Sequence, residues 1–548
     1  MQNFIEVMTL IGAVAFFIML LTITLLTIWM IRLYRKNVKQ PQHALLRGYP
    51  LMGKIRYIAE MVGPELRQYW FNNDMEGKPF SRFIFVTIVK MSKYASTIIP
   101  FGSKRDFSAD GFFLRPTPFP LNKSELSVNM KQVGSYIYSL IGHGLFWRNE
   151  KIIQKNLYAW AFTENDYIII GKNDSHIAKH WTVKRPFGAT GMSYGALGKN
   201  AIKTLSLGAA ISETWINTGE GGLTPQHLEG GGNVVYQLGP GLFGSRNSDG
   251  IFSVENFTKN MSYKNVVACE IKHAQGAKVK GGFLPKEKNT PEVAKLRGVE
   301  PGIDIESPNR NPEFHDTPSL IQFIARLKQH SCGKPVGIKI VVGQVEELDS
   351  MFELFSLTGM YPNFITVDGS EGGSGATHQE MADTLALPLF EALPIVVELL
   401  KKHNLRDKIT VFASGKLVTA DQVAIALCLG ADCVNTGRGM MIAMGCIMAE
   451  TCDSNACPAG VATTDPEKEK NLVIEEKKYR VANYVLTMCQ SLFTLGAACG
   501  IKSPRHFNLK HLGYRKSGKT MRGEEYIKYI MEDQLPKEKI SFHEEKMI

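Results

Sequence analysis

The sequence predicts an α/β protein whose main body is a (β/α)8 barrel of the TIM type, preceded by a transmembrane helix and a mixed N-terminal segment. Eight short apolar or β-branched runs, most of them followed by a helix-like stretch, occupy about 250 residues, which is the usual size of such a barrel. Glycine-rich or polar loops end these runs, and the loops after the last two runs carry small and basic residues. An open doubly wound sheet is the alternative architecture.

The first predicted element is a membrane-spanning helix over residues 9–31. This run is uncharged and dominantly apolar, and it is long enough to cross a bilayer once. A cleaved signal peptide is disfavoured, because Glu6 precedes the run and no small-residue cleavage pattern follows it. The basic residues directly after the run predict that the rest of the chain lies on the cytoplasmic side of the inner (cytoplasmic) membrane. They are Arg32, Arg35, Lys36 and Lys39.

The charge of the chain is strongly basic, with 63 Lys and Arg against 52 Asp and Glu and a formal net charge of +11. Nucleic acid, anionic lipid and acidic substrates are all compatible with this balance. Because basic residues cluster beside the predicted membrane helix, we favour anionic lipid and predict no nucleic-acid partner.

Four segments are expected along the chain. Residues 32–185 mix aromatic, basic and polar residues, with short strands such as 167–170, and residues 504–548 read as a packing or oligomer-contact extension. The barrel and its loops fill residues 186–503. Its strands are predicted at 187–192, 210–216, 234–238, 266–271, 336–342, 364–367, 409–413 and 432–435.

The loops after the seventh and eighth predicted strands are candidates for a phosphate site. They read Ser414-Gly415-Lys416 and Thr436-Gly437-Arg438-Gly439. In TIM barrels a phosphate is frequently bound by these two loops. Small residues let backbone N–H groups approach an anion, and a lysine or arginine supplies the opposite charge. Either loop alone is equally consistent with an ordinary turn.

Three of the nine cysteines are closely spaced, at Cys446, Cys452 and Cys457, and Pro458 follows the last. In a cytoplasmic protein such thiols stay reduced and are candidates for metal ligands. Three thiolates suit three irons of an iron–sulfur cluster, and a Cys-Pro ending is typical of ferredoxin-type ligation. A zinc site completed by a distant histidine, or free surface thiols, are the alternatives.

Two glycine-rich loops and one strand carry further candidate site residues. One loop, residues 217–222, presents Glu220 among glycines, and the other, residues 368–375, follows the sixth strand. For both loops an ordinary solvated turn is the alternative to a functional role. Gln275, Lys278 and Arg297 offer amide, ammonium and guanidinium groups for a dicarboxylate. Lys339 lies within an apolar strand, so it needs either an anionic cofactor or a structural acid as its partner.

In combination and order these motifs resemble the FMN-binding synthase domain of the glutamate synthase family. The resemblance covers residues 186–500, and upstream IIPFGSKRDF at 98–107 points to membrane-anchored single-domain members. The motifs that carry it are MSYGALGKNA at 192–201, INTGEGG at 216–222, KHAQGAK at 272–278, AKLRGVEPG at 294–302, ESPNR at 306–310, TVDGSEGGSGA at 366–376, ASGKL at 413–417 and MGC…C…CPAGVATTDP at 444–466.

The resemblance implies FMN at the carboxyl end of the barrel and a 3Fe–4S cluster on Cys446, Cys452 and Cys457. It assigns Glu220, Gln275, Lys278 and Arg297 to catalysis and substrate binding. The residues implied to bind FMN are Met192, Ser193, Asn217, Lys339, Asp368, Gly372, Gly373, Ser414, Gly415, Lys416, Gly437 and Arg438.

The implied reaction is the reduction of 2-iminoglutarate, formed from 2-oxoglutarate and ammonia, to L-glutamate, with hydride from flavin N5. No glutaminase domain and no C-terminal β-helix of the family are recognisable, so we expect ammonia from another source. The loop 278–283 is about one residue shorter than the family pattern. Another 2-oxo or amino acid is therefore an alternative substrate, and a non-enzymatic membrane electron-transfer subunit is a further alternative. No G-x-G-x-x-G fingerprint follows a strand, which favours ferredoxin or a reductase as electron donor.

Overall fold

The computed structural model describes residues 1–143, 148–276, 278 and 282–534 of the chain. These residues separate into two units, Met1–Phe83 and Ile84–Ile548. The bounds of the four segments predicted from the sequence stay predictions.

The smaller unit is helical. Its elements are α1 (Gln2–Lys39), α2 (Ala44–Gly48), α3 (Gly53–Leu66) and the π-helical turn η1 (Arg67–Phe71). Within α1, the stretch Phe4–Lys39 is long and apolar enough to cross a membrane, and none of its most apolar part is buried against the rest of the chain. The helix expected at 9–31 is therefore present and extends further at both ends.

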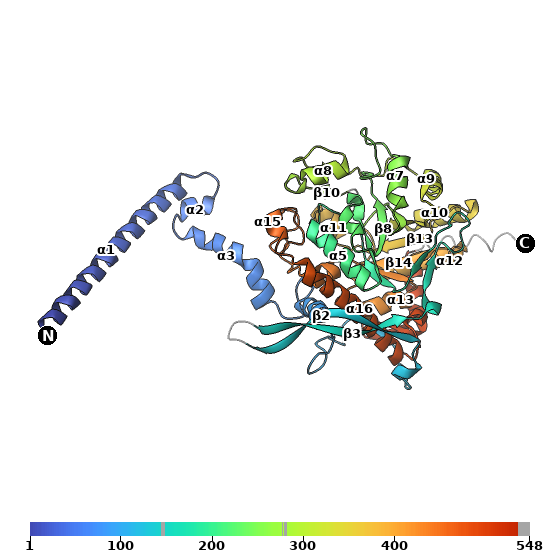
Figure 1. Ribbon diagram of the computed structural model, residues 1–548, viewed down its shortest axis with the longest axis horizontal. Coiled ribbons are helices and arrows are strands. Elements are labelled where there is room, and N and C mark those ends of the chain that lie inside the picture. The colour runs from blue at the N-terminus through green and yellow to red at the C-terminus, as the bar shows by residue number, and fades with distance from the viewer. Residues whose placement is uncertain (144–147, 277, 279–281, 535–548) are drawn as a thin grey trace, which may run out of the picture. The chain divides into compact units, whose positions relative to one another are not determined.

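The larger unit is built on an eight-stranded parallel barrel, so the predicted fold class is confirmed (Figure 1). In sheet order the strands run β6, β15, β14, β13, β12, β9, β8 and β7, and a parallel bridge between Gly191 and Asn217 joins the two ends. Their bounds are β6 (Phe187–Ala189), β7 (Trp215–Asn217), β8 (Asn233–Leu238), β9 (Val266–Lys272), β12 (Val336–Ile340), β13 (Phe364–Asp368), β14 (Thr410–Ser414) and β15 (Cys433–Thr436).

All eight predicted strands occur, but the second was placed too early. Ala210 and Ile211 end a helix, and the strand begins only at Trp215. The apolar residues at 209–211 are the last turn of that helix, whose alanine-rich sequence favours helix over strand. The apolar residues at the end of this helix and at the start of the strand are close in the sequence, so they were predicted as one strand.

Helices connect the strands and cover the barrel (Figure 1). Those of the barrel region are α5 (Lys199–Ile211), α6 (Pro225–Leu228), α7 (Val254–Ser262), α8 (Pro291–Arg297), α9 (Thr317–His330), α10 (Val345–Thr358), α11 (Gln379–Thr384), α12 (Leu389–Lys402), α13 (Ala420–Cys428), α14 (Arg438–Met444), α15 (Pro466–Glu469) and α16 (Ile474–Ala498). A short antiparallel pair, β10 (Phe283–Leu284) with β11 (Ile305–Glu306), precedes and follows α8.

Elements on either side of the barrel in the chain pack onto it. Helix α4 (Arg82–Tyr94) precedes β1 (Gly111–Leu114), which pairs with β16 (Leu512–Lys516), and β16 pairs with β17 (Lys519–Arg522). Helix α17 (Gly523–Gln534) then follows, and the Tyr526 hydroxyl donates to the Phe390 carbonyl of α12 at 3.1 Å. The described part of the C-terminal extension, residues 504–534, thus packs against the barrel.

A long antiparallel hairpin, β2 (Val128–His143) with β3 (Arg148–Phe162), was not predicted. Its alternation is interrupted by exposed apolar residues such as Ile152 and Tyr158, which removes the period-2 signal. Phe162 packs with Cys489 and Phe493 of α16. Because α16 also packs against α5, the hairpin is fixed to the body of the barrel through this helix.

The amino end of the barrel is closed by a second hairpin, β4 (Ile168–Ile170) with β5 (Trp181–Val183). Trp181 packs against Trp215 and Phe412 from the lowest layer of the barrel, with ring centroids 5.6 and 5.8 Å apart. Ile168, Ile170 and Val183 complete this apolar cluster. The interior of the barrel at this end is therefore filled by apolar side chains.

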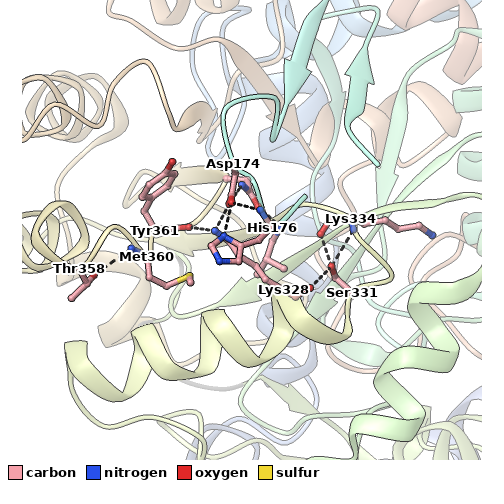
Figure 2. Close-up of polar contacts among 10 residues, drawn as sticks. Asp174, His176, Lys328, Ser331, Lys334, Thr358, Met360 and Tyr361 are labelled. Atoms are coloured by element: carbon pink, nitrogen blue, oxygen red, sulfur yellow. Dashed lines mark hydrogen bonds and ion pairs between the residues drawn. The ribbon is translucent and has the colours of Figure 1, made fainter. Parts of the chain in front are cut away.

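A buried ion pair ties the β4–β5 connection to the barrel (Figure 2). Asp174 pairs with Lys328 at the end of α9, and the Asn363 side chain donates to the same carboxylate at 2.8 Å. Lys328 also donates to the Tyr361 carbonyl. Burial alone raises the pKa of Asp174, but the hydrogen bonds from Lys328 and from the His176 backbone outweigh it and lower the pKa from 3.8 to about 2. The stabilisation is therefore complete above the unfolded pKa and is lost as the pH falls toward 2.

We expect Asp174→Ala to lower the free energy of unfolding by about 3 kcal/mol, because it leaves the Lys328 ammonium buried without its acid. Urea unfolding followed by circular dichroism measures the change. The double variant Asp174→Ala/Lys328→Met removes the unpaired charge and should recover part of the loss, whereas Asp383→Ala on an exposed part of α11 should change little. Equal losses in the single and double variants would contradict this account of the ion pair.

Candidate active site

The centre of the barrel holds one buried carboxylate, that of Glu270 on β9. Side chains from three other strands donate hydrogen bonds to it: Asn217 of β7 at 2.8 Å, Gln237 of β8 at 2.6 Å and Thr366 of β13 at 2.6 Å. Charge-assisted bonds of this kind are short and strong, and they compensate the cost of burying the charge. Asn217, which was expected to bind the cofactor, is thus held in place from below, and its amide oxygen also accepts from the Gly219 backbone at 2.9 Å.

One layer above Glu270, two lysines stand side by side on paired strands. Lys272 of β9 and Lys339 of β12 are register partners, so their side chains lie on the same face of the sheet. Lys272 pairs with Glu220 at 2.9 Å and Lys339 pairs with Asp368 at 3.1 Å. Lys339 therefore has an acidic partner in Asp368, and its predicted contact with the cofactor stays a prediction.

Glu220 is buried at the end of the loop after β7. Its burial alone raises the pKa, but the positive charges of Lys272, Lys278 and Arg297 outweigh this and lower the pKa below its ordinary value. Its Oε1 accepts from Lys272, whereas Oε2 has no hydrogen-bond partner among the described residues. Glycines line this carboxylate, because a β-carbon at Gly282 would come within 2.2 Å of Oε1.

Arg297, at the end of α8, separates the Glu220 site from an outer cavity. The cavity has a volume of about 520 Å³ and is also lined by Tyr194, Arg246 and Lys295. Arg297 Nη2 donates to the Tyr194 carbonyl at 3.1 Å, and the guanidinium lies 5.0 Å from the centre of the Phe243 ring. Burial lowers the pKa of Arg297 to about 10, so it remains a cation at neutral pH. Its Nε has no partner within the described part of the chain.

The loop after β9 lies directly against the loop after β13. Gln275 Nε2 donates to the Gly373 carbonyl at 3.4 Å, and Lys278 Nζ donates to the Ala376 carbonyl at 3.0 Å. The Gly276 backbone donates to Asp368 at 3.0 Å, and a β-carbon at Gly276 would lie 1.7 Å from the Gly369 carbonyl oxygen. Lys278 is close enough to Glu220 to affect its pKa, so the structure brings it and Arg297 to the same carboxylate.

The two predicted phosphate loops are neighbours, because Ser414 of β14 and Asn435 of β15 are register partners. A β-carbon at Gly437 would lie 2.9 Å from the Thr190 side chain, and one at Gly373 would lie 2.7 Å from Arg438 Nε. The absence of side chains at these glycines therefore lets three loops approach one another closely.

Positive charge faces these loops. Lys416 and Arg438 both interact with the carboxylate of Glu371, and Arg438 Nη2 donates to the Glu371 carbonyl at 2.6 Å. Glu371 in turn accepts from the Leu389 backbone at the start of α12, at 3.1 and 3.2 Å. A β-carbon at Gly372 would lie 3.1 Å from the Asp368 carboxylate, and one at Gly415 would lie 3.3 Å from that of Glu371.

Met192 and Ser193 lie in the loop after β6. The Met192 backbone donates to the Asn217 carbonyl at 3.3 Å, and a β-carbon at Gly219 would lie 2.6 Å from the Ser193 backbone nitrogen. Met192 Sδ is 4.0 Å from the position of a β-carbon at Gly437. This loop therefore joins the Glu220 loop to the predicted phosphate loops around the mouth of the barrel.

Cys446, Cys452 and Cys457 lie near one another on the segment after α14. Burial is the main reason that the pKa of Cys446 is raised to about 11, and the thiolate charges of Cys452 and Cys457 add to it. No three His, Cys, Asp or Glu side chains in the described residues converge closely enough to form a metal site. Lys288 Nζ donates to the Cys452 carbonyl at 2.5 Å and to the Ala462 carbonyl at 2.9 Å, which places a cation beside the thiols.

Sequence reasoning missed Glu270, Lys272 and Lys288. The first two alternate on an otherwise apolar strand, Cys269-Glu270-Ile271-Lys272, and charged residues at i and i+2 within a buried strand indicate side chains on one face of it. That signal was available. Lys288 follows Lys286 and Glu287, and such a run is indistinguishable from an ordinary solvated turn.

The conserved region of glutamate synthase matches residues 147–502 of this chain. The chain belongs to the glutamate synthase family. The glutamate synthase large subunit-like protein YerD of Bacillus subtilis is 47% identical over 88% of this chain and 92% of its own length. The family predicted from the motifs and the enzyme class, an oxidoreductase, are confirmed by these matches.

Other glutamate synthase relatives match over the barrel region. The archaeal-type glutamate synthase [NADPH] of Thermotoga neapolitana is 30% identical over 60% of this chain and 62% of its own length. The glutamate synthase [NADPH] large chain of Bacillus subtilis is 29% identical over 59% of this chain, which is 20% of that protein. Among solved structures, the recombinant flavin-binding domain of baker's yeast flavocytochrome b2 covers 78% of this chain at 13% identity and a TM-score of 0.40.

We expect Gly276→Ala to destabilise the folded chain by about 1–3 kcal/mol, because the new methyl group would overlap the Gly369 carbonyl and force the two loops apart. Gly375→Ala is the matched control in the opposing loop, since its nearest neighbour would be 4.0 Å away. Urea unfolding of both variants measures the difference. Equal stability of the two variants would show that the loops are not in contact.

Proposed function

We propose that this protein is an FMN- and iron–sulfur-dependent glutamate synthase-like oxidoreductase, which reduces 2-iminoglutarate, formed from 2-oxoglutarate and ammonia, to L-glutamate. The observation that carries the proposal is the group of cations around Glu220 at the mouth of the barrel, formed by Lys272, Lys278 and Arg297. A dicarboxylate needs such cations, and an imine or ammonium nitrogen needs a carboxylate such as Glu220.

The residues at the barrel mouth fit FMN. Close approach at Gly415 and Gly437 leaves room for backbone contact with a phosphate, and Lys416 and Arg438 supply positive charge. Lys339 would hold the flavin ring from the strand side, with Asp368 keeping its ammonium in place. When bound, FMN supplies the hydride for the substrate carbon.

The thiols fit an iron–sulfur cluster in their chemistry. Cys446, Cys452 and Cys457 are soft donors on one segment, and Lys288 places a positive charge beside them that favours thiolates and an anionic cluster. The cluster would supply electrons one at a time.

The chain's own side chains would bind and orient the substrate. Arg297 presents a fixed guanidinium at the cavity side, and Lys278 presents a second cation at the loop side, so that a five-carbon dicarboxylate is held at both ends. Glu220 Oε2, which has no partner among the described residues, would accept an N–H of ammonia or of the imine. Lys272 holds Glu220 ionised for this task.

A different 2-oxo acid is the second candidate substrate. Gln275 and Lys278, which were expected to contact 2-oxoglutarate, donate to the backbone carbonyls of Gly373 and Ala376. Residues 277 and 279–281 of the same loop lie outside the described part of the chain. A substrate screen with anaerobic, chemically reduced enzyme decides between the two.

We also propose that α1 anchors the protein in the inner membrane with the barrel on the cytoplasmic side, since basic residues follow its apolar stretch. Electrons would come from ferredoxin or a separate reductase.

We expect Arg297→Ala to lower kcat/KM for 2-oxoglutarate by about 100-fold in the presence of ammonium and a chemical reductant, because the substrate loses its fixed orientation. Anaerobic formation of L-glutamate measures the rate. Arg297→Lys keeps the positive charge but loses the two-pronged guanidinium, so its kcat/KM should lie between those of Arg297→Ala and the unaltered enzyme. Arg310→Ala, at an exposed position, should leave kcat/KM unchanged. If Arg297→Ala kept full turnover, the substrate clamp would be wrong, and turnover of another 2-oxo acid alone would favour the second candidate.

We expect Cys452→Ser to remove most of the iron while leaving bound flavin unchanged, because the two groups are held by different segments. Metal analysis and the flavin absorbance of anaerobically purified protein measure both quantities. Cys332→Ser, a half-buried cysteine outside the predicted ligand set, should retain full iron. Zinc in place of iron in the unaltered protein, or equal iron in the two variants, would overturn the assignment.

A further inference from the structure

Helix α3 and the turn η1 carry a continuous apolar stripe. At 100° per residue, Ile55, Ile58, Val62 and Leu66 of α3 fall within one sector of the helix, and Tyr69 and Trp70 follow in the π-helical turn η1. Among the charged residues of α3, Lys54, Arg56 and Glu60 lie outside this sector, and Glu65 lies beside its edge. The helix is therefore amphipathic through five turns, although it is part of no packed core.

This stripe is exposed throughout. Ile55, Ile58 and Trp70 keep 56%, 55% and 80% of their surface accessible, and no residue of the stripe is buried by the described part of the chain. A surface helix of a soluble domain would turn such a face toward a core. Six large apolar side chains along one exposed face instead indicate that this face contacts an apolar surface outside the described chain.

The chain fixes this helix close to the end of α1. Only the connection 40–52 separates α1 from α3, and it contains the short helix α2. The Asn37 side chain of α1 donates to the Pro50 carbonyl at 2.6 Å, and the His43 and Tyr57 rings meet edge to face at 5.1 Å. If α1 crosses a bilayer, α3 lies at the level of the headgroups on the side where α1 ends.

Charge in this region matches an anionic surface. Residues 32–71 contain eight Lys and Arg but only two acidic residues, Glu60 and Glu65. The formal charge of this short stretch is therefore +6, more than half of the +11 of the whole chain. Basic residues beside an apolar helix face are the signature of a helix that lies in the headgroup region of anionic lipid.

We propose that α3 and η1 form an interfacial helix that lies on the anionic lipid surface beside the α1 span, with Ile55, Ile58, Val62, Leu66, Tyr69 and Trp70 in the acyl-chain boundary. The inference rests on the proposed membrane span of α1 and goes beyond it, since it assigns a second, parallel contact with the bilayer. It is independent of the proposed reaction.

Tryptophan quenching by brominated lipid tests the two contacts separately. The full-length protein is placed in nanodiscs of phosphatidylcholine and phosphatidylglycerol, with and without bromine on the acyl chains near the headgroup. Trp29 lies in α1 and Trp70 in η1, whereas Trp160 lies on β3 of the larger unit. Trp70→Phe should remove about half of the bromine-dependent loss of fluorescence, because two tryptophans contribute to it. Trp29→Phe should do the same, and Trp160→Phe should leave the loss unchanged.

A second pair of variants tests the stripe itself. Val62→Glu places a charge in the apolar sector and should abolish quenching of Trp70 while that of Trp29 persists. Met61→Glu makes a similar change one residue away, about 100° around the helix and outside the apolar sector, and should have little effect. If the bromine-dependent quenching fell in Trp29→Phe but not in Trp70→Phe, the interfacial helix would be overturned and the membrane span of α1 kept. If it fell in neither variant, both would be overturned.

Discussion

The structure depends on the requirement that every charge inside a closed barrel finds a partner. Water cannot enter the packed lower layer, where Trp181, Trp215 and Phe412 fill the available space. The charged groups inside the barrel are each matched: Glu270 by three donors, Lys272 by Glu220 and Lys339 by Asp368. These pairs fix the strand register, because a slip of one residue would turn each of them out of the barrel.

The same pairing leaves the mouth of the barrel positively charged. Six cationic side chains lie there, namely Lys272, Lys278, Arg297, Lys339, Lys416 and Arg438, against the four carboxylates of Glu220, Glu270, Asp368 and Glu371. An excess of cations in a partly enclosed site attracts anions and strengthens their binding. A phosphate on the β14 and β15 side and a dicarboxylate on the Glu220 side are the ligands that this distribution of charge favours.

The order of the strands, the loops after them and the thiol segment were predictable, because each has a local signature: an apolar run, a glycine beside a basic residue, a cysteine spacing. An acidic side chain was one of the two partners expected for Lys339, and Asp368 is such a partner, while the contact of Lys339 with a cofactor stays a prediction. Pairing across the barrel was not predictable. Glu220 and Lys272 are 52 residues apart, and only closure of the sheet brings them together. The β2–β3 hairpin was missed because its exposed apolar residues hide the alternation that identifies a strand.

The unsatisfied atoms of the site indicate what a ligand contributes. Glu220 Oε2 and Arg297 Nε are both buried, and neither has a hydrogen-bond partner among the described residues. Each such group costs about 1–3 kcal/mol while it stays unpaired. A ligand that donates an N–H to Glu220 and offers a carboxylate oxygen to Arg297 recovers both contributions at once, whereas a simple dicarboxylate recovers only one. Under the proposed function, this difference at the nitrogen would favour the imine over the 2-oxo acid.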